Sequence, residues 1–157
     1  LKTFPKESPK KIEALLSQIK ETEKELAALK AKLASGALDE VINNAKEVKG
    51  IKCIVHSFEG MNADDLRSMG DKLRDKFANS VVILTTTEGE KVSVVGMASK
   101  QAVAQGAHAG NIIKEITKHA GGSGGGRPDM AQGGIKEAAK VKDALAIVEQ
   151  VLEAQLK

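Results

Sequence analysis

Seven of the 15 glycines in this 157-residue chain lie between residues 121 and 134, in the sequence GGSGGGRPDMAQGG. This cluster is the strongest constraint on the fold, because residues without a Cβ atom can adopt positive φ angles and let another backbone or a ligand approach closely. Three interpretations are open at this point: a flexible linker, a phosphate-binding loop, or a rigid loop that contacts another group.

The residues that follow the glycines argue against the first two interpretations. A flexible linker does not require Arg127, Pro128 and Gln132, which introduce a planar cation, a fixed φ angle and an amide. A Walker loop ends in Gly-Lys-Ser/Thr, whereas this segment continues with Arg127 and Pro128. Pro128 lacks a backbone donor, and Asp129 adds a negative charge where an anion would bind. The sequence therefore predicts a rigid loop and no nucleotide hydrolysis.

A heptad pattern near the N-terminus predicts a coiled-coil-like helix over residues 9–34. We call its apolar a and d positions the apolar seam: Ile12, Leu15, Ile19, Leu26, Leu29 and Leu33. Thr22 occupies one d position and weakens the pattern. Two alternatives remain open: the seam packs on the chain's own domain, or it pairs with another helix, in the same chain or in a second copy. Gly36 is expected to end this helix, and a shorter helix is expected over 37–48.

The apolar periodicity changes after Gly50, which predicts a globular domain there. We expect strands over 51–58, 80–87 and 91–98, the last two paired antiparallel, and helices over 62–77, 99–120 and 135–157. The expected fold class is α+β. A helical arm, residues 1–49, precedes a small globular domain, residues 50–157, which has a mixed sheet flanked by helices and a Gly-rich loop.

Catalytic and metal-binding groups are scarce in the sequence. The three histidines, His56, His108 and His119, are far apart and share no ligand spacing with the single cysteine, Cys53. Cys53 lies in a predicted strand and is expected to be an inert core thiol. No serine lies in a motif that would activate its hydroxyl. We therefore expect no catalytic residue and no metal site in this chain.

Composition limits the remaining functional classes. A lone cysteine cannot form an internal disulfide, which suits a reducing compartment, so we expect a cytoplasmic protein. No apolar run approaches the roughly 20 residues of a membrane-spanning helix. The aromatic content is only 2%, which argues against a module that stacks single-stranded bases on aromatic rings. Because the chain begins without methionine, we expect it to be a piece of a longer polypeptide.

The glycine segment resembles a family signature. Residues 121–134 match the pattern Gly-Gly-x-Gly-Gly-Gly-Arg-Pro-x-x-Ala-Gln-Gly-Gly near the C-terminus of alanyl-tRNA synthetases, and the expected order of strands and helices is similar to that family's C-terminal domain. Ile135 departs from the pattern, since many relatives carry a further glycine there. The matched positions are candidates for binding tRNA or shaping the loop: Gly121, Gly122, Gly124, Gly125, Gly126, Arg127, Pro128, Ala131, Gln132, Gly133 and Gly134.

The resemblance implies the non-catalytic C-terminal domain of a class II, ATP-dependent alanine–tRNA ligase. Such a domain would bind alanine-specific tRNA at its outer corner and help aminoacylation and editing act on one tRNA. The catalytic and zinc-bearing editing domains would lie upstream in the same chain, so ATP and zinc are implied there and no cofactor is implied here. In some members this domain supports dimerisation. The alternative function is therefore an assembly module that forms a homodimer through the 9–34 helix.

The globular part also resembles the domain that follows the catalytic DHH domain in certain phosphoesterases and single-strand exonucleases. In those proteins a related glycine-rich loop lies against the substrate. This chain has no Asp-His-His motif, so their activity is not implied. Within residues 121–134, Arg127 and Gln132 are the side chains expected to face RNA, and the glycines are expected to shape the loop.

Overall fold

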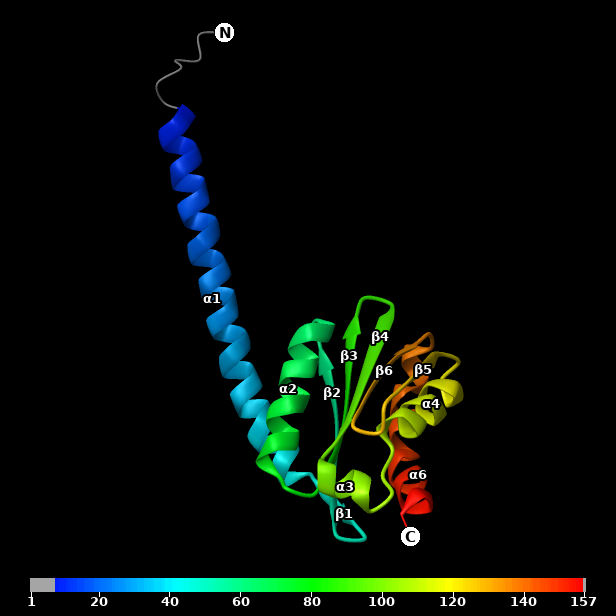
Figure 1. The fold of residues 1–157 in the computed structure, drawn as a ribbon. Coiled ribbons are helices and arrows are strands. Elements are labelled where there is room, and N and C mark those ends of the chain that lie inside the picture. The colour runs from blue at the N-terminus through cyan, green and yellow to red at the C-terminus, as the bar shows by residue number, and fades with distance from the viewer. Residues whose placement is uncertain (1–7, 157) are drawn as a thin grey trace. The chain divides into compact units, whose positions relative to one another are not determined.

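The computed structural model describes residues 8–156, without the side chains of Ser8 and of residues 30–35. The chain forms two compact units, Leu1–Asp39 and Glu40–Lys157. The N-terminal unit is helical: α1 spans Ser8–Asn43 (Figure 1). Five residues of the apolar seam are more than half exposed: Ile12, Leu15, Ile19, Leu26 and Leu29. The side chain of Leu33, the remaining seam position, lies outside the described residues.

The predicted end of the first helix at Gly36 is wrong, because α1 continues through this residue. A glycine ends a helix when it adopts a positive φ angle, and Gly36 does not. In a helical conformation it only weakens the helix, by about 1 kcal/mol relative to alanine. A Cβ added to Gly36 would meet no atom within 4 Å, so no neighbouring group requires a glycine there.

The predicted helix over 37–48 is also wrong in its second half. Lys46–Val48 forms a short strand, β1, which pairs antiparallel with β2 (Ile51–Glu59). The two residues between them, Lys49 and Gly50, have φ angles of 48° and 83°. A two-residue loop with positive φ at both positions matches the twist of a hairpin. The hairpin therefore takes residues that the periodicity alone assigned to a helix.

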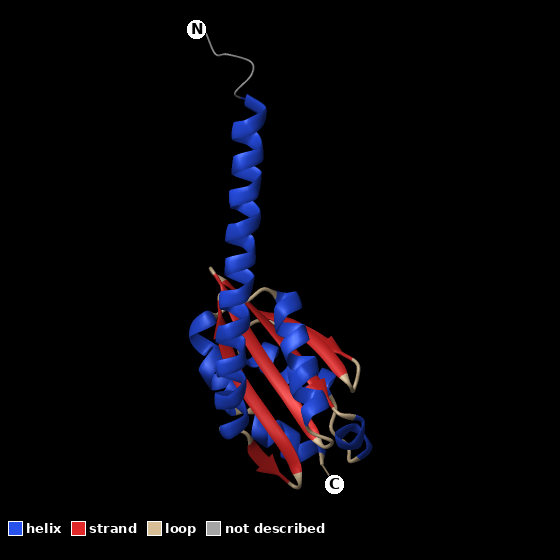
Figure 2. Ribbon diagram, turned by 90° about the vertical axis from the view of Figure 1, so that its left-hand side faces the viewer, coloured by secondary structure: helices blue, strands red, loops and turns tan. Residues whose placement is uncertain are grey.

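Six strands form one mixed sheet in the order β1-β2-β3-β4-β6-β5 (Figures 1 and 2). Only β2 and β3 run parallel, and helix α2 (Ala63–Lys76) makes the crossover between them. The other strands are β3 (Ser80–Glu88), β4 (Lys91–Ala98), β5 (Ser123–Gly126) and β6 (Met130–Ile135). The predicted α+β class, mixed sheet and antiparallel pairing of β3 with β4 are therefore confirmed.

Helix α2 begins as the sequence predicts. The Asn62 side chain accepts a hydrogen bond from the Asp65 N–H group at 2.7 Å, which satisfies one of the free donors of the first turn. Leu66, Met69 and Leu73 recur on one side of the helix and are buried against β3 and β4. These three apolar residues therefore form the packed face of α2.

Helix α4 (Ala109–His119) lies on the face of the sheet opposite to α2. A Cβ on Gly96 of β4 would lie 2.7 Å from Ile113 of α4. A Cβ on Gly70 of α2, in contrast, would lie 3.0 Å from the sulfur of Met97, the next residue of β4. Successive side chains of a strand point to opposite faces, so α2 and α4 lie on different sides of the sheet. The other elements in the C-terminal half are α3 (Lys100–Ala104), η1 (Ala138–Lys140), α5 (Val141–Ala146) and α6 (Val148–Gln155).

Two long helices predicted from periodicity are interrupted in the structure. The first, over 99–120, is broken between α3 and α4, where Gly106 has a φ of 111°. A Cβ there would lie 2.8 Å from the carbonyl oxygen of Gln155. The second, over 135–157, begins later than predicted because Ile135 belongs to β6, and it consists of η1, α5 and α6.

Candidate functional site

The glycine segment is a β-hairpin rather than a loop. Its first part forms β5 and its last part forms β6, and a turn of three residues, 127–129, joins them. β6 also pairs with β4, so the hairpin extends the sheet to its edge. Glycine has a low intrinsic preference for strands, and this is why the sequence indicated a loop.

One face of the hairpin lies tightly against α4. A Cβ on Gly124 would lie 2.8 Å from Cγ2 of Ile113, and one on Gly133 would lie 2.7 Å from Cγ2 of Thr117. Real side chains do not approach so closely, so these two positions accept only glycine unless the helix moves. Ala131 is on the same face, where it is buried. The absence of a Cβ atom at Gly124 and Gly133 therefore lets α4 and the hairpin pack closely together.

The connection from α4 into β5 also depends on glycine. Gly121 has a φ of 68°, and the N–H group of Gly122 donates to the Thr117 carbonyl oxygen at 2.7 Å. A Cβ on Gly122 would overlap the carbonyl oxygen of Gly134 on β6. These three motif positions lie at the base of the hairpin, away from its turn.

The turn is held by backbone hydrogen bonds. The N–H groups of Ala109 and Gly110, at the start of α4, donate to the carbonyl oxygens of Pro128 and Arg127 at 2.9 and 3.1 Å. The N–H group of Ala98 donates to the Asp129 carbonyl oxygen at 3.0 Å. The first donors of α4 are thereby used within the protein, and the turn that carries Arg127 is held by three hydrogen bonds from α4 and β4.

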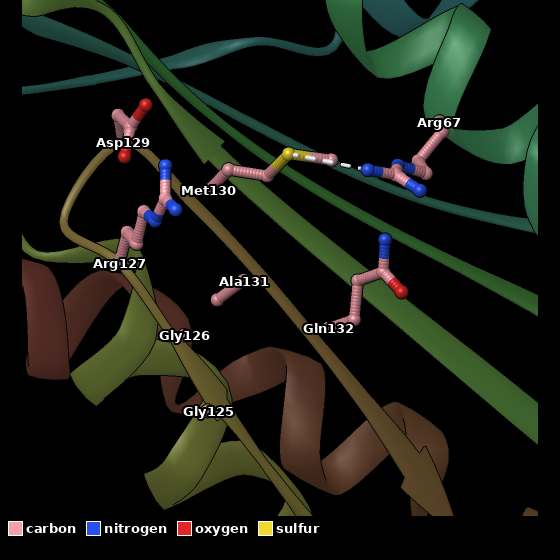
Figure 3. A pocket seen from close by; sticks show the side chains of 8 residues that line it. All are labelled: Arg67, Gly125, Gly126, Arg127, Asp129, Met130, Ala131 and Gln132. Carbon is pink, nitrogen blue, oxygen red and sulfur yellow. Dashed lines mark hydrogen bonds between the residues drawn. The ribbon is translucent and has the colours of Figure 1, made fainter.

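The other face of the hairpin is open to solvent. Met130 and Gln132 alternate with Ala131 along β6, and in Figure 3 they extend toward the side on which Arg67 of α2 lies. An open hollow of about 460 Å³ lies there. We call it the hairpin hollow. Its lining consists of Arg67, Gly125, Gly126, Arg127, Asp129, Met130, Ala131 and Gln132.

The hairpin hollow contains two arginines that carry no carboxylate partner. Within residues 8–156, the Arg127 guanidinium forms no ion pair or hydrogen bond, and neither does the Gln132 amide. The Arg67 side chain donates through Nη2 to the sulfur of Met130 at 3.7 Å. Asp129 is the single acidic residue of the lining. The hollow therefore has an excess of one positive charge, and its polar side chains are available to a ligand.

Arg67 is a residue that sequence reasoning missed. It lies on the exposed side of α2, 60 residues before Arg127, and no local pattern links the two. One signal was available: the chain has 24 basic residues, and only Arg67, Arg74 and Arg127 are arginines. A guanidinium makes planar, bidentate contacts that an ammonium cannot, so these three positions were worth inspecting.

Cys53 and His108, which lie outside the hollow, have structural roles. Burial raises the pKa of the Cys53 thiol to about 12, which confirms an inert core cysteine. His108 caps α4, where its Nδ1 atom accepts from the Asn111 N–H group at 3.2 Å. The described part of the chain contains no group of three or more His, Cys, Asp or Glu residues that could hold a metal ion. None of its helices is long and apolar enough to cross a membrane.

The amino-acid sequence matches one domain family and a group of curated proteins. The DHHA1 domain family matches residues 50–154. The alanine–tRNA ligase of Acetivibrio thermocellus is 49% identical over 99% of the chain, and that of Alkaliphilus metalliredigens is 43% identical over 99%. The chain spans only 18% of the length of each of these relatives.

Solved structures share the architecture. The C-Ala domain from Aquifex aeolicus alanyl-tRNA synthetase is 30% identical, with a TM-score of 0.65, and the match covers 70% of this chain and 98% of that domain. The DHH domain protein PF0399 has a TM-score of 0.55 over 85% of this chain and 33% of its own. At 15% identity this second match concerns the fold alone.

Proposed function

Because the chain belongs to the DHHA1 domain family, in the form of the C-Ala domain of alanyl-tRNA synthetase, we propose that it is the tRNA-binding, non-catalytic C-terminal domain of an alanine–tRNA ligase. In this role it holds alanine-specific tRNA so that aminoacylation and editing, carried out by the upstream catalytic and editing domains, act on the same molecule. ATP and zinc serve those upstream domains. The ligase would work in the cytoplasm, where the free thiol of Cys53 stays reduced.

The observation that carries this proposal is the position of Arg127 and Gln132 in the hairpin hollow. The family motif presents both side chains on the open face of the hairpin, beside the backbone of Gly125 and Gly126. A nucleic-acid backbone can approach glycine closely, and a guanidinium can donate two parallel hydrogen bonds to a phosphate. With only 2% aromatic residues, binding would rest on charge and on the shape of the RNA rather than on base stacking.

Binding of fluorescently labelled tRNA, measured by anisotropy over a range of salt concentrations, tests this proposal. We expect the logarithm of the association constant to fall linearly with the logarithm of salt, by about 0.7 to 0.9 for each phosphate neutralised. Alanine-specific tRNA should bind more tightly than a tRNA of another specificity. Absence of binding at low salt, or binding that salt does not weaken, would refute the proposal.

A second function, assembly of the ligase through α1, is favoured by the apolar seam. Its residues Ile12, Leu15, Ile19, Leu26 and Leu29 have exposed fractions between 52% and 59%, which is unusual for so many large apolar side chains in one helix. A seam of this heptad spacing is covered when a second helix packs along it. Sedimentation of the chain over a range of concentrations, beside the tRNA titration, separates the two functions: an assembly module associates without RNA.

A further inference from the structure

We propose that Arg67 and Arg127 act together as a clamp on the phosphodiester backbone of RNA in the hairpin hollow, and that Met130 positions Arg67 for this contact. The inference rests on the proposed function and adds to it a second binding element, helix α2, which lies outside the glycine motif. It also assigns the hollow a specific chemical group of the RNA.

The use of arginine across the chain is the first argument. Of the three arginines, Arg74 is committed within its own helix, where it forms ion pairs with Asp71 at 2.9 Å and Asp75 at 3.0 Å. The other two, Arg67 and Arg127, come from different parts of the fold and line the same hollow. Neither is neutralised by a carboxylate among residues 8–156. Two planar, unpaired cations in one hollow are suited to bidentate recognition of phosphate oxygens.

The charge of the hollow suits a phosphodiester. Arg67 and Arg127 provide two positive charges and Asp129 removes one, which leaves an excess of one. A phosphodiester linkage carries a single negative charge, which this excess is sufficient to neutralise. The hollow is also open, so an RNA strand can pass through it without being enclosed (Figure 3).

Contacts beyond the phosphate also suit RNA. The glycine backbone of Gly125 and Gly126 leaves room for the sugar beside the two arginines. The Gln132 amide can donate to and accept from a ribose 2′-hydroxyl or a base edge.

Met130 explains how an arginine on an exposed helix is held toward the hollow. Its sulfur accepts a hydrogen bond from Nη2 of Arg67 at 3.7 Å, and it extends from β6 toward α2 (Figure 3). A thioether is a weak acceptor that carries no charge. It therefore orients the guanidinium and leaves its positive charge in place. An aspartate or glutamate at this position would neutralise that charge. Met130 is accordingly a positioning residue, and Arg67 is a binding residue.

The affinity of variants for a tRNA transcript tests the clamp. Arg67→Ala and Arg127→Ala should each weaken binding about 5- to 150-fold, the range of a good bidentate arginine contact. Each should also reduce the salt slope by about 0.7 to 0.9, the contribution of one phosphate. Arg67→Lys should restore only part of the affinity, because an ammonium lacks the planar fork. Lys72→Ala is the matched control: it removes one exposed positive charge from the same helix at a site outside the hollow.

The chain's three arginines allow a direct second readout. In a ¹⁵N NMR spectrum each arginine contributes one Nε–H signal, which its own substitution assigns. Addition of a short RNA hairpin should move the signals of Arg67 and Arg127 and leave that of Arg74 in place. Met130→Ala should lower RNA affinity in the wild-type chain but not in the Arg67→Ala variant, a dependence that a residue with only a packing role would not show.

The outcomes separate the clamp from the proposed function. If the wild-type chain fails to bind tRNA, the proposed function itself is refuted. If it binds and Arg67→Ala loses no more affinity than Lys72→Ala, RNA binding stands and the clamp is refuted. If the Arg67 and Arg127 signals move with a polyglutamate peptide but not with the RNA hairpin, the hollow is a protein-binding site and the clamp is likewise overturned.

Discussion

The Nζ atom of Lys49 lies 3.0 Å from the carbonyl oxygen of Leu156, so a residue in the β1–β2 turn binds the C-terminal end of the domain. The same ammonium group lies 3.3 Å from the carbonyl oxygen of Glu153 in α6. The last carbonyl groups of a helix have no partner within it, and a cation there also complements the helix dipole. Lys49 adopts a φ of 48°, which is unfavourable for a residue with a side chain.

Lys49 therefore makes a testable contribution to stability. We expect Lys49→Met to lower the free energy of unfolding by about 1 kcal/mol, because it removes both hydrogen bonds and keeps the strained backbone. Lys49→Gly should cost less, since glycine adopts the positive φ angle without strain. Urea denaturation of both variants measures the difference. If Lys49→Met proves no less stable than wild type, the contact between the turn and α6 contributes nothing.

Two adjacent glycines of β6 provide a test of close packing against α4. Gly133→Ala should lower stability by about 1 to 3 kcal/mol, since its Cβ would lie 2.7 Å from Thr117 Cγ2. Gly134→Ala is the matched control: its Cβ would meet only the Val92 carbonyl oxygen, at 3.8 Å, and it should change stability by no more than about 0.5 kcal/mol. Thermal melting of the pair gives the result. Equal losses of stability in the two variants would contradict close packing of Gly133 against α4.

The apolar seam of α1 provides a test of assembly. If it pairs with a second copy, replacing Ile19 and Leu26 together with aspartate should convert the dimer to monomers, because each substitution places a charge where the partner helix excludes water. Both side chains are about half exposed, at 52% and 53%, so the globular unit should stay folded. Sedimentation and circular dichroism measure the two properties. A wild-type chain that is monomeric at high concentration excludes this mode of assembly.

His56 should make stability depend on pH. Burial lowers the pKa of His56 in the folded state, and the negative charge of Glu40 opposes this in part. The unfolded chain then binds a proton more readily than the folded chain, so stability is full above the unfolded pKa, near 6.5, and falls as the pH drops through this value toward the lowered pKa of the folded state. Denaturation between pH 7.5 and about 5 should show a shallower decline for His56→Gln and a steeper one for Glu40→Gln. If wild type, His56→Gln and Glu40→Gln lose stability identically as the pH falls, protonation of His56 does not cause the decline.

Much of the fold follows from local sequence patterns. The start of α2 depends on Asn62 and the Asp65 N–H group three residues later, and its buried face depends on the spacing of Leu66, Met69 and Leu73. The β3–β4 hairpin follows from two runs rich in β-branched residues on either side of Gly89, whose φ is 63°. These features depend on residues within one or two turns of each other, where periodicity and turn chemistry act directly.

The candidate site was predicted only in part, because its second half comes from a distant element. The glycine motif by itself indicates Arg127 and Gln132, since both lie within the matched residues 121–134. Arg67 belongs to the same hollow only because α2 packs on β3 and β4 while β6 pairs with β4. A single sequence contains no local signal for such a contact, since it depends on the relative placement of three elements.

The sequence by itself determined the family motif, the order of most strands and helices, and the apolar faces that build the core, because short-range periodicity and backbone preferences decide these. The tertiary structure alone decided that residues 123–126 and 130–135 are strands, that α1 passes through Gly36, and that Arg67 joins Arg127. Glycine has no strong preference of its own, so its conformation is set by its neighbours. Here those neighbours are the backbone of β4 and the side chains of α4, which lie far away in the chain and close in space.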